Sequence, residues 1–75
     1  MMNIMIYAIE NHIYIQSNEM MQDVRVDIRS CEGKYLKSCD IKNSCYEKIE
    51  MGSNLGKVRV RITGDKRYIE KQIIV

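Results

Sequence analysis

The sequence predicts an all-β domain, a sandwich of about seven short antiparallel strands, and three observations favour this fold class. Ile and Val together supply 17 of the 75 residues, and β-branched side chains favour strands. The good helix formers are scarce, because the chain has one Ala and two Leu. Apolar and polar residues also alternate with a period of two over several short segments, which is typical of strands with one buried face.

The length and composition indicate one soluble domain that spans residues 1–75. A chain of 75 residues has room for a single small core. Its content of 45% hydrophobic and 29% charged residues is globular rather than disordered. No apolar run reaches the length of a membrane-spanning helix, and the first residues lack the basic region of a signal peptide. We therefore expect a cytoplasmic protein if the chain is complete, or a piece of a longer exported protein.

Alternation is clearest in two segments. Val24, Val26 and Ile28 alternate with charged residues, and Val58, Val60 and Ile62 do the same further along the chain. Turn signals such as Ser17-Asn18, Lys42-Asn43-Ser44 and Gly52-Ser53-Asn54 separate the segments. The expected strands are Ile4–Ile9, Ile13–Ile15, Val24–Ile28, Tyr35–Cys39, Tyr46–Met51, Val58–Ile62 and Tyr68–Val75.

Gly33 and Gly64 are expected to form structural turns, and Gly56 leads the strand that begins at Lys57. A three-residue loop with a left-handed Gly33 places Ile28 opposite Leu36, whereas a two-residue turn places Ile28 opposite Lys37 on the core face. We prefer the first register because it agrees with burial and charge together.

The last hairpin is expected to turn at Gly64-Asp65, which pairs Val60 with Ile69 and leaves Lys71 opposite Val58. A lysine at that position favours an edge strand or a bulge. The chain then closes on the apolar residues Ile73, Ile74 and Val75, which we expect to pack into the sandwich or to contact a partner.

Charge is distributed unevenly along the chain. Residues 1–50 carry six basic and eight acidic side chains, a balance of −2, whereas residues 51–75 carry six and two, a balance of +4. Lys57, Arg59 and Arg61 form a basic stripe on alternate positions of one strand. We expect this stripe and the terminal strand to contact a protein, since the aromatic platforms of nucleic-acid binders are not evident.

Candidate catalytic and metal-binding residues are few. His12 is the single histidine, and Cys31, Cys39 and Cys45 have the spacing C-x7-C-x5-C, without the short C-x2-C pair of zinc sites. We therefore expect no catalytic residues, no metal, no cofactor and no small-molecule substrate. A disulfide between Cys39 and Cys45 is geometrically possible, and the sequence leaves it open.

Three stretches resemble the C-terminal sorting domains of proteins that the type IX secretion system of Bacteroidetes exports, or related immunoglobulin-like modules of that phylum. They are VRVDIRSCEGK at Val24–Lys34, LGKVRVRI at Leu55–Ile62 and EKQIIV at Glu70–Val75. Upstream, IYAIENHIYI at Ile6–Ile15 is similar to the opening hairpin of some members. This chain departs from the family in lacking a proline-containing opening and in having Val58 where an aromatic is usual.

The resemblance implies a seven-stranded immunoglobulin-like sandwich that has no catalytic activity. The export machinery would recognise this domain as a sorting signal. The family positions would be Gly33, Lys34, Gly56 and the terminal segment Lys71–Val75. The alternative function is a stand-alone structural protein that forms a homodimer through an edge strand, because a core this small gives a monomer little stability. We expect no membrane insertion in either case.

Overall fold

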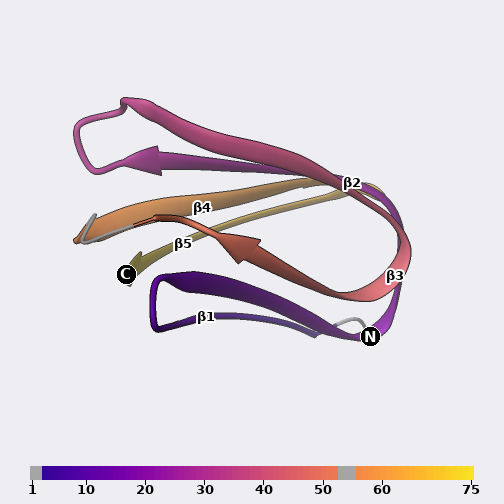
Figure 1. Ribbon diagram of the computed structural model, residues 1–75. Helices are drawn as coiled ribbons and strands as arrows, with labels where there is room; N and C mark the ends of the chain where they lie inside the picture. The colour runs from indigo at the N-terminus through magenta and orange to yellow at the C-terminus, as the bar shows by residue number, and fades with distance from the viewer. Residues whose placement is uncertain (1–2, 53–55) are drawn as a thin grey trace.

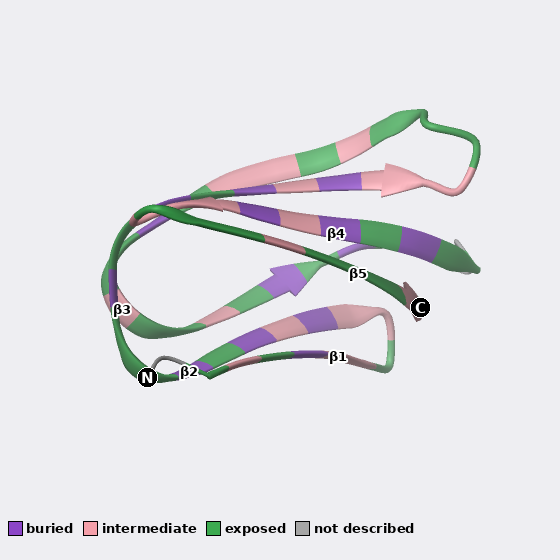
Figure 2. Cartoon of the chain, turned by 180° about the vertical axis from the view of Figure 1, so that it is seen from behind, coloured by how far each residue is buried: buried purple, intermediate pink, exposed green. Residues whose placement is uncertain are grey.

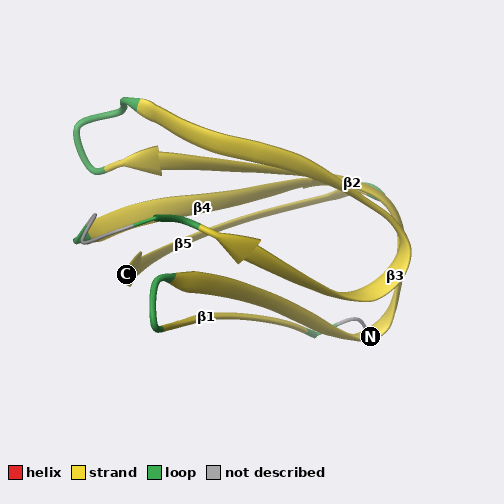
Figure 3. Ribbon diagram, in the orientation of Figure 1, coloured by secondary structure: helices red, strands yellow, loops and turns green. Residues whose placement is uncertain are grey.

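The computed structural model describes residues 3–52 and 56–75, and its regular structure consists of β-strands alone (Figure 3). The strands form a single antiparallel sheet with the order β1-β2-β4-β5, and β3 pairs with the other edge of β2. The prediction of an all-β antiparallel domain is confirmed. The strands are β1 (Ile4–Ile9), β2 (His12–Ser30), β3 (Tyr35–Glu50), β4 (Lys57–Gly64) and β5 (Arg67–Ile74).

The described residues form five strands rather than about seven, because two pairs of expected strands are continuous. β2 joins the segments around Ile13 and Val24, and β3 joins Tyr35–Cys39 to Tyr46–Met51. The turn signals between them mark bends within strands. The β2–β3 register shifts between Gln16 and Met21, and Asn43 has a φ of 53°. Such bulges bend a strand without ending it.

The bend divides the sheet into two halves that face each other (Figure 1). The first half holds β1, the start of β2 and the end of β3, and the second half holds the rest of β2 and β3 with β4 and β5. The sheet therefore curls back on itself and brings β1 beside β5. The structure is a curled half-barrel made of one sheet, so the sandwich of two sheets expected from the sequence is not confirmed.

The core fills the inside of the curl, and the bend changes which residues face it. Before the bend the buried residues of β2 are odd-numbered, such as Ile13 and Ile15, and after the bend they are even-numbered, such as Val26 and Ile28. Four residues of β2 stand against one residue of β3 at the bend, and the three extra residues make this change possible, since an odd number of single-residue slips reverses the faces. Figure 2 shows the resulting alternation of buried and exposed positions along β2 and β4.

The β2–β3 hairpin confirms the left-handed glycine but corrects the predicted register. Gly33 has a φ of 93°, and Arg29 pairs with Tyr35 as the three-residue loop requires. A bulge at Leu36 then places Lys37, not Leu36, opposite Ile28. The lysine is tolerated there because β3 is an edge strand and the Lys37 ammonium donates a 2.6 Å hydrogen bond to the Glu50 carbonyl.

The β4–β5 hairpin turns at Asp65-Lys66, one residue later than predicted. Both residues have left-handed backbones, with φ of 48° and 61°, as a two-residue hairpin turn requires. Ile69 therefore pairs with Ile62 rather than Val60. Gly64 lies before the turn, where a Cβ atom would come within 2.4 Å of the Asp23 carbonyl oxygen. This glycine is needed because the hairpin packs directly on the backbone of β2.

Candidate functional site

The terminal strand β5 has an open edge. It pairs with β4 only, and Val75 donates a 2.8 Å main-chain hydrogen bond to Gly56 at the end of that pairing. Hydrogen-bonded and non-hydrogen-bonded pairs alternate along an antiparallel ladder. The main-chain groups that point away from β4 therefore belong to Tyr68, Glu70, Gln72 and Ile74.

The gap between β5 and β1 is bridged by one lysine. Lys71 lies opposite the buried Val60 on the inner side of β5, not opposite Val58 as predicted, and β5 is an edge strand as expected. Its ammonium donates a 2.9 Å hydrogen bond to the carbonyl of Ile6 on β1. An inward-facing charge of this kind keeps an edge strand from pairing indiscriminately.

Of the last three residues, two pack against the core and one is exposed to solvent, where it could contact a partner. Ile73 and Val75 are half-buried and pack against the core, whereas 72% of the Ile74 surface is exposed. The end of the chain thus contributes to the core and also presents an apolar side chain beside the open edge.

The basic stripe lies on the outer face of β4, where Arg61 contacts a carboxylate directly and Arg59 interacts with the same carboxylate only through its charge. The Arg61 guanidinium contacts the Glu70 carboxylate at 3.2 Å, and the Tyr68 hydroxyl donates to the same carboxylate at 2.8 Å. These two hydrogen bonds, that of Tyr68 first, lower the pKa of Glu70 below its ordinary value. Among the described residues, Arg59 and Lys57 form no side-chain hydrogen bond or ion pair.

The outer face of the first half carries a cluster of tyrosines that the sequence analysis did not predict. The rings of Tyr7 and Tyr14 stack with centroids 5.2 Å apart, and Tyr46 lies 6.3 Å from Tyr14. Exposed Met5 and Ile9 flank them on β1. The sequence signal for this cluster was the turn at Glu10-Asn11. It pairs β1 with β2 and sets Tyr7 opposite Tyr14.

His12 and the cysteines do not form a site. The His12 ring contacts the Glu10 carbonyl through Nδ1 at 2.9 Å and the Glu50 carboxylate through Nε2 at 3.8 Å. All three cysteines are free, so Cys39 and Cys45 are not bridged. Burial, followed by the charges of Glu47 and Asp40, raises the pKa of the Cys39 thiol. Within residues 3–52 and 56–75, no group of His, Cys, Asp or Glu is placed to hold a metal.

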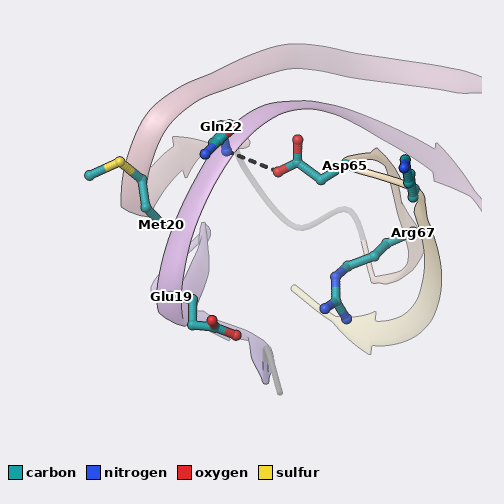
Figure 4. A pocket seen from close by; sticks show the side chains of 6 residues that line it. Glu19, Met20, Gln22, Asp65 and Arg67 are labelled. Carbon is teal, nitrogen blue, oxygen red and sulfur yellow. Dashed lines mark hydrogen bonds between the residues drawn. The ribbon is translucent and has the colours of Figure 1, made fainter.

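A wide hollow of about 400 Å³ lies between the bend of β2 and the β4–β5 turn (Figure 4). Glu19, Met20 and Arg67 are at its margins. Its central carboxylate, that of Asp65, accepts main-chain hydrogen bonds from Gln22 at 2.9 Å and Asp23 at 3.2 Å. The hollow is therefore explained as the joint that fastens the turn to the bend.

Comparisons with protein-family models and with curated proteins give no match for this chain. The described part of the chain also contains no helix that could cross a membrane.

Proposed function

We propose that this protein is a non-enzymatic interaction module that binds a partner protein by strand addition along the open edge of β5. The observation that carries the proposal is the one-sided pairing of β5, which leaves the main-chain groups of Tyr68, Glu70, Gln72 and Ile74 directed away from β4. An added strand gains affinity from main-chain hydrogen bonds and needs no pocket.

The side chains beside the edge indicate the chemistry of the partner strand. Ile74 is exposed at the end of β5, and on the neighbouring strand β4 the side chains of Lys57 and Arg59 form no ion pair among the described residues. A strand with an apolar residue near Ile74 and acidic residues on its outer face would complement this surface. Such a strand would also cover the half-buried margin of the core at Ile69 and Ile73.

The sorting-domain resemblance gives this proposal its specific form. In that form the partner is the type IX export machinery. The curled sheet then presents the recognised segment, as the immunoglobulin-like sandwich does in sorting domains. The family positions at Lys71–Val75 coincide with the open edge of β5, which supports a role of this segment in recognition.

The experiment attaches the chain to the C-terminus of a fluorescent cargo in a bacterium that carries the type IX system, and it measures delivery to the cell surface. The variant is Gln72→Pro, because proline removes an N–H that points away from β4 and is tolerated on the solvent side of an edge strand. The matched control is Gln72→Ala, which removes the same side chain and keeps the N–H. We expect delivery with the wild type and the control, and its loss with Gln72→Pro or on deletion of Ile73–Val75.

Delivery that does not depend on the attached chain would remove the sorting function. Equal delivery by Gln72→Pro and Gln72→Ala would instead remove strand addition as the mode of contact. Circular dichroism of the purified Gln72→Pro variant checks that its sheet is intact.

The alternative partner is a second copy of this chain, which the exposed Ile74 and the open β5 edge also favour. Light scattering then gives a dimer for the wild type and for Gln72→Ala, and a monomer for Gln72→Pro. A clean wild-type monomer at high concentration would contradict this alternative.

A further inference from the structure

Two arginines lie side by side on the outer face of the second half of the sheet. Arg29 on β2 is directly opposite Arg59 on β4. Their row continues to Tyr35 on one side and Gln72 on the other, so it contains no carboxylate. Like charges directly opposite each other destabilise a sheet. The pair is thus an electrostatic cost that the fold alone does not explain.

The carboxylates of the next row are already engaged. Asp27 contacts Arg25 at 3.7 Å, and Glu70 is held by Arg61 and by the Tyr68 hydroxyl. Arg25 and Arg61 therefore each contact a carboxylate, whereas among the described residues Arg29 and Arg59 contact none, although the charge of Arg59 acts on Glu70 from a distance.

The two guanidinium groups border a shallow hollow and differ in how they are held. Arg29 donates to the Gly33 carbonyl at 3.3 Å and lies 5.8 Å from the centre of the Tyr35 ring, so the loop positions it. Arg59 is exposed and has no such anchor among the described residues. The hollow beside them has a volume of about 80 Å³, and Ser30 and Gly33 line it together with Arg61 and the engaged carboxylates of Asp27 and Glu70. One water takes about 30 Å³ in the liquid, so a single phosphate group fits there.

We propose that Arg29 and Arg59 form a binding site for a phosphate group. A phosphate dianion neutralises both guanidinium groups at once, and its oxygens accept paired N–H donors from arginine. Arg29 provides the fixed half of the site and Arg59 the half that closes on the anion. The proposal deepens the proposed function by naming the chemistry that the basic stripe recognises, and it can be tested without a partner strand.

The experiment titrates inorganic phosphate into the full chain near neutral pH, at constant ionic strength maintained with sodium chloride, and follows amide and arginine Nε–H signals by NMR. We expect saturable shifts at Arg29, Arg59 and Gly33. Arg59→Gln should weaken phosphate binding by about tenfold, the usual effect of losing a charge-assisted hydrogen bond. The matched control, Arg67→Gln, removes an exposed charge at the far end of β5 and should leave the dissociation constant within about twofold.

A second measurement separates a ligand site from a structural role. Without phosphate, Arg59→Gln should unfold at the same or a higher denaturant concentration than the wild type, because the substitution relieves repulsion. Loss of stability in this variant would overturn the proposal. Shifts produced equally by sodium chloride, or phosphate affinity unchanged in Arg59→Gln, would also overturn it.

A parallel titration with acetate tests whether the site prefers a carboxylate to a phosphate. Acetate should bind more weakly than phosphate because it carries one charge rather than two. Saturation by acetate at lower concentrations than phosphate would reject phosphate as the ligand and assign the pair to a carboxylate. Failure of surface delivery or of dimer formation leaves these titrations unaffected, so the two proposals are tested separately.

Discussion

The two halves of the curled sheet share one kind of interior and present different outer faces. Inside, both halves contribute Ile and Val side chains that are almost completely buried. Outside, the first half shows stacked tyrosines flanked by Met5 and Ile9, whereas the second half shows rows of arginines and carboxylates. The inward residues therefore determine the fold, and the outward residues leave two different surfaces for binding.

The joint between the β4–β5 turn and the bend of β2 should be the position most sensitive to substitution. Gly64→Val places a branched side chain against the Asp23 backbone at a φ of 130°, and it should cost about 3 kcal/mol or more of unfolding free energy. Gly33→Ala is the comparison, because Gly33 has a φ of 93° but open space around it, and it should cost about 1 kcal/mol. Denaturant unfolding measures both values, and equal losses would show that packing at Gly64 is unimportant.

The next prediction compares the stability lost by truncating a buried residue of the first half with that lost by truncating a residue on its outer face. Ile13 is completely buried, whereas Ile9 on the neighbouring strand is 54% exposed. Ile13→Ala should lower the unfolding free energy by about 2–5 kcal/mol through the cavity it leaves, and Ile9→Ala should change it by about 0.5 kcal/mol or less. A comparable loss at Ile9 in urea titrations would indicate that another surface covers the tyrosine face.

The smallest effect concerns the charged rows of the second half. The Tyr68 hydroxyl is the first cause of the lowered pKa of Glu70, so Tyr68→Phe should raise that pKa toward its ordinary value. Because the folded-state pKa is lowered, the Glu70 contribution to stability is present at neutral pH and is lost as the pH falls through that pKa. NMR titration of the Glu70 side chain measures the change. Tyr35→Phe, whose hydroxyl contacts Ser38, should leave the Glu70 titration unchanged.

Much of the local structure was predictable, since the clearest alternating segments of the sequence lie within strands. The segments Ile4–Ile9, Val24–Ile28 and Val58–Ile62 all lie within strands. The bends were not predictable, because Ser17-Asn18 and Asn43 have the same composition as a true turn. The difference between a bend and a turn depends on whether the neighbouring strand bends as well, which is a property of the β2–β3 pairing.

The candidate site was predicted in part, and the missing part depended on pairing between strands. The stripe at Lys57, Arg59 and Arg61 was visible from spacing alone, and it lies on one face of β4. Its opposition to Arg29 depends on the β2–β4 register, which brings together residues thirty positions apart. The position of Lys71 was likewise missed by two residues because the last hairpin turns at Asp65-Lys66.

Hydrogen exchange along β5 tests the central claim, the open edge, most directly. Residues that face β4, such as Ile69, Lys71 and Ile73, should have protected amides, and Tyr68, Glu70, Gln72 and Ile74 should exchange rapidly. We therefore expect protection at every second residue when NMR follows the isolated protein at low concentration. Uniform protection along β5 would contradict it, because the outer edge would then already be paired.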